Sequence, residues 1–167
     1  MDNTPVRPDG EIERIVDEYA SELFRLCLVM LKNTHDAEDA VQDTLLSYLQ
    51  RAPEFESRES ERSWLLTVAA NRCRDSLRRA KRHPSVSMDE LTELGATDEH
   101  ALVLDALMAL PEKFRLVLTL HYVEGYRTEE IAEMVGCRPA TVRTRLHRAR
   151  KQLKLDLEGS YDEEQLE

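Results

Sequence analysis

The stretch that most restricts the fold of this chain lies at residues 126–153 and reads YRTEEIAEMVGCRPATVRTRLHRARKQL. Thr128 can cap the start of a short helix, and the two glutamates after it lie where the helix dipole favours negative charge. Gly136 can end that helix because glycine tolerates a positive φ, and Pro139 suits the first turn of a second helix. The pattern therefore predicts two helices joined by a tight turn.

The second of these helices is predicted to have an apolar side and a basic side. The apolar side repeats at helical spacing and consists of Val142, Leu146, Ala149 and Leu153. The outward side carries Arg138, Arg143, Thr144, Arg145, His147, Arg148 and Lys151. An ordinary amphipathic helix with a solvated basic face would have the same pattern. The capped helix and the glycine turn before it favour a helix-turn-helix, whose second helix lies in the DNA major groove.

The rest of the chain also favours helices. Aromatic residues make up 5% of the sequence, there are 5 glycines and 6 prolines, and no strand-like alternation stands out. Apolar residues instead recur at three- and four-residue intervals over most of the chain. We therefore predict an all-α protein with two small helical domains joined by a flexible linker. The predicted bounds are 10–83 for the N-terminal domain, 84–99 for the linker, 100–156 for a C-terminal four-helix helix-turn-helix domain and 157–167 for an acidic tail.

Two helices are predicted in the first part of the N-terminal domain. Residues 12–31 form one long helix with a continuous apolar face. A second helix begins at a cap near Thr34 or Asp36 and ends at the break before Pro53. Its inward residues are predicted to be Ala37, Val41, Leu45, Tyr48 and Leu49, and its outer face is acidic.

A polar loop and a third helix are predicted to follow. Residues 53–62 are polar and aperiodic, which is typical of an exposed loop, and helical periodicity resumes at Ser63. Trp64 lies at the start of the apolar side of this helix, so core packing is favoured over stacking on nucleic-acid bases. Basic residues gather toward the C-terminal end of the helix.

The linker and the tail have little periodicity. Residues 83–98 contain proline, glycine, serines and acids, a composition typical of a linker, and a helix is predicted to follow at about 100–110. The few apolar residues of the linker could dock on a partner or pack locally, and the sequence leaves both open: Met88, Leu91 and Leu94. Residues 157–167 are predicted to be a solvated acidic end, or a segment that screens the basic helix.

The charge of the chain is strongly segregated. The formal net charge is −10, yet residues 71–83 carry a net +5 and residues 138–154 a net +7, which leaves −22 for the remainder. An acidic body repels phosphate except where a basic patch faces it, so DNA binding by the chain alone should be weak and salt-sensitive. A further partner surface is therefore expected.

Several other classes of protein are disfavoured by the sequence. Cys27, Cys73 and Cys137 are widely spaced, without the pairing of a zinc site or a disulfide framework, which fits a reducing cytoplasm. The N-terminus lacks the features of a secretory leader, and no run approaches the ~20 apolar residues needed to span a bilayer. No converging set of acids, bases or metal ligands suggests an enzyme, so we expect no catalytic residues, cofactor or metal.

Two separated blocks of this sequence together resemble the extracytoplasmic-function group of bacterial RNA polymerase sigma factors, over nearly the whole chain. The first block consists of THDAEDAVQDTLLSYL and ERSWLLTVAANRCRDSLRR, and the second is LPEKFRLVLTLHYVEGYRTEEIAEMVGCRPATVRTRLHRARKQL. The resemblance implies a subunit that binds core polymerase and directs promoter-specific initiation, while polymerase supplies all nucleotide chemistry. Members of the group are commonly held by an anti-sigma factor, so the resemblance implies that partner as well.

The resemblance implies a role for three sets of residues. Asp36, Asp39, Gln42 and Asp43 lie on the helix that docks on the clamp helices of the polymerase's largest subunit. The loop of residues 55–63 and the basic helix after it correspond to the site that captures a flipped base of the minus-ten element and holds the melted strand: Phe55, Ser63, Asn71, Arg72, Arg74, Arg78, Arg79 and Arg82. The positions that read the minus-thirty-five element correspond to Arg138, Thr141, Arg143, Thr144, His147 and Arg148.

This chain departs from the family pattern at two positions. Glu61 stands where the family commonly has an aromatic residue, and Ala70 where it often has an arginine. The alternative to a sigma factor is a free-standing helix-turn-helix regulator whose first domain dimerises or senses a ligand. That alternative predicts tight duplex binding without polymerase, which the acidic remainder of the chain disfavours.

Overall fold

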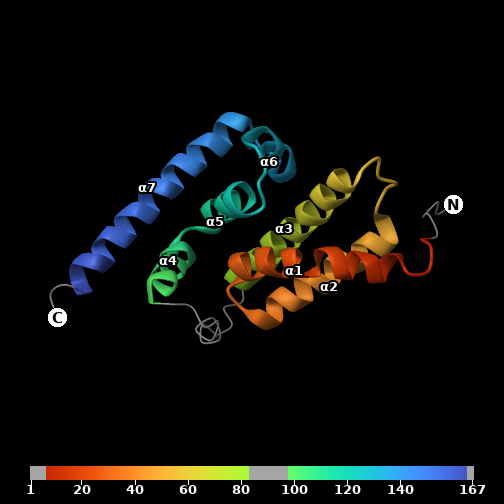
Figure 1. Cartoon of the computed structure of the whole chain (residues 1–167), viewed down its shortest axis with the longest axis horizontal. Coiled ribbons are helices and arrows are strands. Elements are labelled where there is room, and N and C mark those ends of the chain that lie inside the picture. Colours follow the sequence, from red (N-terminus) through yellow and green to blue (C-terminus); the bar gives the residue numbers. More distant parts are fainter. Residues whose placement is uncertain (1–6, 83–97, 165–167) are drawn as a thin grey trace. The chain divides into compact units, whose positions relative to one another are not determined.

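The structure is a computed structural model that describes residues 7–82 and 98–164, with side chains at residues 7–80 and 102–158. Over these residues the backbone is helical apart from short connections, and the described part contains no β-strand. The chain divides into two compact units, Met1–Met88 and Asp89–Glu167 (Figure 1). The predicted all-α class is therefore confirmed.

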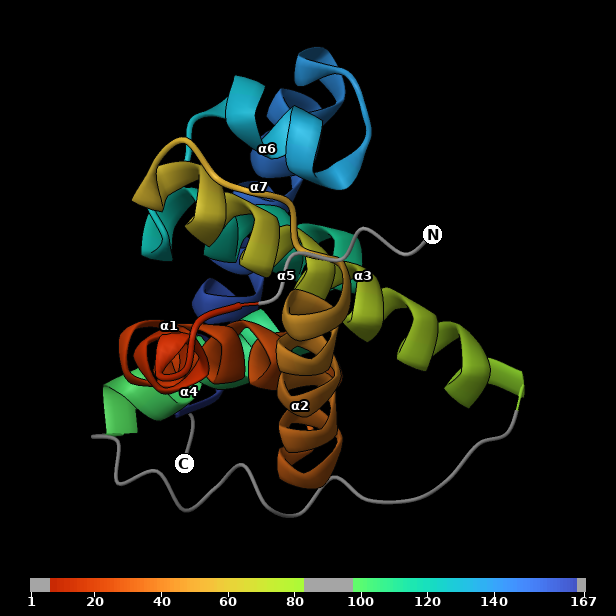
Figure 2. The same ribbon diagram turned by 90° about the vertical axis from the view of Figure 1, so that its right-hand side faces the viewer.

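The first unit is a bundle of three helices that all contact one another (Figure 2). Helix α1 spans Glu11–Leu31 and helix α2 spans Thr34–Arg51. The cap of α2 is Asn33, whose side-chain oxygen accepts a 2.8 Å hydrogen bond from the backbone N–H of Asp36. The sequence had predicted this cap one to three residues later, because Asn33 was assigned to the connection.

Helix α3 spans Arg58–Arg82 and begins five residues earlier than the sequence predicted. The side chains of Ser57 and Ser60 explain the early start. Each hydroxyl oxygen accepts a hydrogen bond from the backbone N–H of the other serine, at 3.1–3.2 Å. This reciprocal arrangement caps a helix as a capping box does. The loop between Ala52, the C-cap of α2, and the start of α3 is therefore only residues 53–57, and Ser63 lies on the helix instead of in the loop.

Large apolar side chains fill the centre of this bundle. Among the fully buried residues are Ile15, Leu23, Leu26, Met30, Tyr48, Leu65 and Leu66. Burying a side chain of this size contributes roughly 1.5–3 kcal/mol each, before the loss of conformational entropy. Leu49 was predicted to face inward but is 39% exposed, while Ala70 is buried against the core.

The second unit is built on α7, which spans Pro139–Glu164 and contacts the three helices before it: α4 (Asp98–Ala109), α5 (Glu112–Leu118) and α6 (Thr128–Val135). A π-helical turn, Thr119–Val123, extends α5. The guanidinium of Arg115 is buried and donates hydrogen bonds to the carbonyl oxygens of Leu110 and, at 3.4 Å, Met108. Burial lowers the pKa of Arg115, and its bonds satisfy carbonyls that the end of α4 leaves open.

Two sequence predictions about the ends of this unit have different outcomes. The tail was predicted to be aperiodic, but α7 continues to Glu164. Side-chain pairs one turn apart extend the helix past Leu153, with Gln152 and Asp156 at 2.8 Å and Lys154 and Glu158 at 3.7 Å. The linker at 83–97, with Met88, Leu91 and Leu94, lies outside the described residues.

Candidate nucleic-acid interface

The helix-turn-helix predicted from sequence is formed by α6 and α7. Gly136 ends α6 in the left-handed region at φ 70, and Pro139 opens α7. Thr128 is the first residue of α6 and Arg127 precedes it as the cap, with its backbone N–H bonded to the Glu130 carboxylate at 2.8 Å. The turn therefore forms where the sequence indicated, with the cap shifted by one residue.

One side of α7 faces the core and the other is open to solvent. Val142, Leu146 and Ala149 are buried, as predicted. The residues mapped to the minus-thirty-five element lie near the start of this helix, and all but the half-buried Thr141 are exposed: Arg138, Thr141, Arg143, Thr144, His147 and Arg148. Arg143 approaches Glu129 of α6 at 3.8 Å, a long and exposed ion pair that leaves its side chain 58% accessible. Such a pair is easily exchanged for another anion.

A second basic surface lies on the C-terminal half of α3. Arg72, Asp75, Arg78 and Arg79 line an open recess of about 350 Å³. Arg72 reaches across to α2 and donates a 2.8 Å hydrogen bond to the Ser47 hydroxyl. This places its guanidinium at the edge of the recess without neutralising its charge.

The other residues assigned to this surface vary in their partners. Arg78 pairs with Asp75 at 3.4 Å, while Arg74 donates to the exposed Asn71 at 2.8 Å. Arg79 is exposed, and the side chain of Arg82 lies outside the described residues.

The basic residues at the start of α3 have different surroundings. Arg58 forms an ion pair with Glu18 of α1, and Arg62 pairs with Glu22 one turn further on. The acidic face of α1 therefore balances the first turns of α3, which leaves the excess positive charge on its later turns. The hydrogen bonds and charge of Arg58 hold the pKa of Glu18 below its ordinary value.

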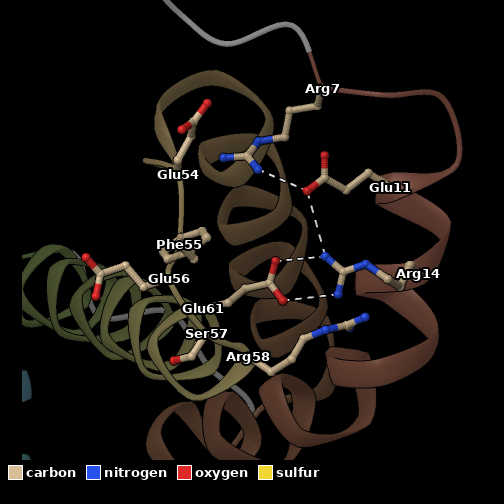
Figure 3. A pocket seen from close by; sticks show the side chains of 9 residues that line it. All are labelled: Arg7, Glu11, Arg14, Glu54, Phe55, Glu56, Ser57, Arg58 and Glu61. Carbon is tan, nitrogen blue, oxygen red and sulfur yellow. Dashed lines mark hydrogen bonds and ion pairs between the residues drawn. The ribbon is translucent and has the colours of Figure 1, made fainter.

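An open pocket of about 580 Å³ lies beside the loop of residues 53–57 (Figure 3). It is lined by Arg7, Glu11, Arg14, Glu54, Phe55, Glu56, Ser57, Arg58 and Glu61. Phe55 packs at one side of this pocket, stacked on Tyr48 with ring centroids 6.2 Å apart and edge-on to Trp64 at 5.9 Å. Trp64 is half-buried in this aromatic cluster, in agreement with a packing role.

Glu61 is the buried centre of a polar network beside the pocket. Its carboxylate accepts hydrogen bonds from both terminal nitrogens of Arg14 at 2.8 and 3.0 Å, from Tyr48 at 2.7 Å and from Tyr19 at 3.3 Å. Burial pushes the pKa of Glu61 upward, but the hydrogen bonds from Arg14 and Tyr48 outweigh it and the pKa lies below its ordinary value. The buried carboxylate of Glu61 is thus accommodated by partners on α1 and α2.

Comparison with known proteins identifies the family. Residues 15–83 match the model of sigma-70 region 2, and residues 100–153 match that of sigma-70 region 4. The SigL sigma factor of Mycobacterium tuberculosis is 34% identical over 155 residues, covering 86% of this chain and 87% of that protein. The chain belongs to the extracytoplasmic-function sigma factors of bacterial RNA polymerase.

Other relatives agree with this assignment. SigM of Mycobacterium tuberculosis is 32% identical, and the match covers 84% of this chain and 74% of SigM. SigW of Bacillus subtilis is 29% identical, and the match covers 86% of this chain and 87% of SigW. The sigma factor RpoE of Bartonella quintana, solved with the anti-sigma factor NepR, has the same fold with a TM-score of 0.72 at 24% identity, over 89% of this chain and 97% of that one. CnrH, solved with the cytosolic domain of CnrY, has a TM-score of 0.65 at 25% identity, and the match covers 89% of this chain and 88% of CnrH. Sigma factors of this family are non-enzymatic and direct promoter-specific transcription.

The polymerase-binding residues of this sigma factor were predicted on α2. Asp36, Asp39, Gln42 and Asp43 are all exposed, and the ring of His35 lies 3.7 Å from the Asp39 carboxylate. The sequence did not single out Leu46, which is 52% exposed, or the exposed position of Leu49. The signal for Leu46 was available, since it falls outside the inward spacing of α2.

Two further observations apply to the described part of this sigma factor. Among residues 7–82 and 98–164, no helix is long and apolar enough to cross a membrane. No group of three or more histidine, cysteine or acidic side chains in those ranges is arranged to hold a metal ion.

Proposed function

We propose that this sigma factor binds core RNA polymerase in the cytoplasm and directs initiation by contacting both promoter elements, one with each unit. The observation that carries this proposal is the segregation of positive charge onto two exposed surfaces, the later turns of α3 and the outer side of α7. The remainder of the chain is acidic, which favours binding to DNA only where these surfaces meet it.

The outer side of α7 is proposed to read the minus-thirty-five element. Arg143, Thr144, His147 and Arg148 are exposed on successive turns near the start of the helix, where a recognition helix meets base edges in the major groove. An arginine that bonds O6 and N7 of guanine discriminates by roughly 1–3 kcal/mol. Arg138 and Thr141 lie next to them, at the end that enters the groove first.

The pocket beside residues 53–57 is proposed to hold an unpaired base of the minus-ten element. Its lining includes the guanidinium of Arg58 and the carboxylates of Glu54 and Glu56, with the Phe55 ring at one side. The melted strand would then follow α3, contacting Asn71, Arg72, Arg74, Arg78, Arg79 and Arg82. Contacts with this strand offset an opening cost of about 1.4 kcal/mol per base-pair step.

The exposed face of α2 is proposed to dock on the clamp helices of the polymerase's largest subunit. Asp36, Asp39, Gln42 and Asp43 supply charge and hydrogen-bonding groups, and the exposed Leu46 and Leu49 add an apolar area beside them. Complementary charge speeds and orients association, while apolar burial slows dissociation.

An anti-sigma factor is proposed as a further partner. RpoE and CnrH, which resemble this chain in fold, were solved in complex with NepR and the cytosolic domain of CnrY. These complexes support an anti-sigma partner without identifying it.

The test is transcription from a promoter library by core polymerase with and without the purified chain. We expect new, sequence-specific start sites only when the chain is present, and weak binding of the chain alone to the same DNA. Asp39→Lys should weaken core binding, whereas Asp17→Lys, the same charge reversal at an exposed position of α1 outside the proposed docking face, is the matched control. If core polymerase neither binds the chain nor gains a start site, the proposal fails. Tight duplex binding without polymerase would support a free-standing regulator.

A further inference from the structure

Arg7, before α1 begins, makes an unusual number of contacts with a distant part of the first unit. One terminal nitrogen, Nη2, donates to the backbone carbonyls of Ala52 at 2.7 Å and Pro53 at 2.9 Å. The other, Nη1, donates to Glu11 at 3.0 Å and to the Tyr48 hydroxyl at 3.1 Å. The guanidinium also lies 4.3 Å from the centre of the Tyr48 ring, and only 11% of the side chain is exposed.

One of these carbonyls caps the end of α2 and the other belongs to the first residue of the loop. Ala52 is the C-cap of α2 and Pro53 cannot continue the helix. The last carbonyls of a helix have no partner within it, and a cation there is also favoured by the helix dipole. Arg7 therefore supplies the hydrogen bonds that fix the direction in which the chain leaves α2.

The loop beside the pocket starts at that point. Phe55, two residues after Pro53, stacks on the Tyr48 ring with the planes 11° apart. The Tyr48 hydroxyl lies 2.7 Å from a carboxylate oxygen of Glu11 and 2.7 Å from one of Glu61, and it can donate to either. Arg7 thus contacts both the backbone where the loop begins and the ring against which Phe55 packs.

We propose that Arg7 is a positioning residue that holds residues 53–57 in the conformation that accepts the unpaired minus-ten base. This inference rests on the proposed function of the pocket and adds to it a residue outside the loop and the α3 helix. Both of its terminal nitrogens are engaged by protein acceptors, so Arg7 acts through the loop backbone rather than by contacting DNA.

Lysine is the informative substitution. A lysine keeps the positive charge near Glu11, but its ammonium is a point charge and cannot reproduce the planar fork that spans the two carbonyls and Tyr48. Arg7→Lys is therefore compared with Arg51→Lys, the same change at an exposed position two residues before Pro53.

The first measurement uses the full chain alone. Trp64 is the single tryptophan of the protein and contacts the Phe55 ring, so acrylamide quenching of its fluorescence reports the packing of the loop. We expect Arg7→Lys to increase this quenching while the melting temperature stays close to wild type, and Arg51→Lys to leave both unchanged.

The second measurement uses the reconstituted holoenzyme on promoters that differ at one minus-ten base or at one minus-thirty-five base. Arg7→Lys should reduce discrimination at the minus-ten base about five-fold, in the range of one net hydrogen bond, and leave minus-thirty-five discrimination unchanged. Arg51→Lys should alter neither.

The outcomes separate the two proposals. Unchanged quenching, or increased quenching with unchanged minus-ten discrimination, would overturn the role of Arg7. So would an equal loss at both elements together with a lower melting temperature, which is the result of a general defect in folding. If the wild-type chain gives no promoter-specific transcript, the proposed function fails, and the role of Arg7 in minus-ten recognition fails with it.

Discussion

Among single residues, the most unusual feature of the first unit is a buried carboxylate at the junction of its three helices. Glu61 is 4% exposed and is held by Arg14, Tyr48 and Tyr19. A buried charge is tolerated only when it is paired and hydrogen-bonded, because an isolated one loses its hydration without compensation. The polar network therefore replaces apolar packing at the junction of α1, α2 and α3.

Glu61 should make the first unit sensitive to acid. Its folded-state pKa lies below the ordinary value, so its ionised form stabilises the fold above the unfolded pKa of about 4.3, and this stability is lost as the pH falls through the folded value. Thermal melting between pH 7 and pH 3 should show this loss. In Glu61→Gln, which keeps the shape but not the charge, the melting temperature at pH 7 should be lower and the fall below pH 4.5 smaller. An unchanged acid profile would contradict the account.

The exposed residues of α7 are expected to differ in what they recognise. Arg143→Ala should abolish the preference for one minus-thirty-five base, a loss of roughly 1–3 kcal/mol. Lys151→Ala, two turns further along the exposed side, should weaken all promoters alike because a phosphate contact carries no sequence information. Transcription from a library randomised in the minus-thirty-five element distinguishes the two. Equal effects of both substitutions would refute the assignment.

At the scale of elements, the orientation of the recognition helix depends on the turn at Gly136. Its φ of +70 lies in the left-handed region, and an added Cβ would meet nothing within 4 Å. A substitution there is therefore opposed by backbone strain alone. Cys137 continues the turn, with its N–H bonded to the Ala132 carbonyl at 3.0 Å, so the turn is fixed before α7 begins.

Substitution of Gly136 should separate the strain from side-chain size. Gly136→Val should destabilise the second unit by about 1–2 kcal/mol, the cost of a left-handed conformation for an L-residue. Gly136→Asn is the matched control, because asparagine tolerates this region far better than a β-branched residue. Chemical denaturation followed by circular dichroism measures both. Equal losses for the two variants would show that the cost does not come from φ.

At the scale of the whole molecule, the two basic surfaces lie on different compact units. Arg79 on α3 and Arg143 on α7 share no hydrogen-bond partner among those of the described residues. Free-energy changes at independent sites usually add within about 0.3–0.5 kcal/mol. The two units are therefore expected to contribute separately to promoter binding.

Additivity can be measured with the full chain in the holoenzyme. Arg79→Ala and Arg143→Ala should each weaken promoter binding, and the double variant should lose the product of the two fold-changes within about two-fold. The effect of Arg79→Ala should shrink at high salt, since this change removes a phosphate contact that releases counterions. A double variant no weaker than either single variant would show that the surfaces act as one site.

Local patterns in the sequence were enough to predict the all-α class, the helix-turn-helix and the location of the two basic surfaces. These depend on local chemistry: the spacing of apolar residues, the glycine at 136 and the runs of arginine lie close together in the chain. The predicted start of α3 and the predicted end of α7 were less accurate. Serine hydroxyls extend α3 at its start and side-chain pairs extend α7 at its end, beyond the apolar pattern in both cases.

The assembly of the pocket depends on tertiary packing and could not be predicted from the sequence. Arg7 lies 41 residues before Tyr48 in the sequence, and Glu61 lies 13 residues after it. Nothing in the sequence around any of the three distinguishes it from an ordinary surface or core residue. Their partnership depends on how α1, α2 and α3 pack, which no local pattern encodes. A buried carboxylate and a distant arginine acquire a role only when folding removes them from water and brings their partners within hydrogen-bonding distance.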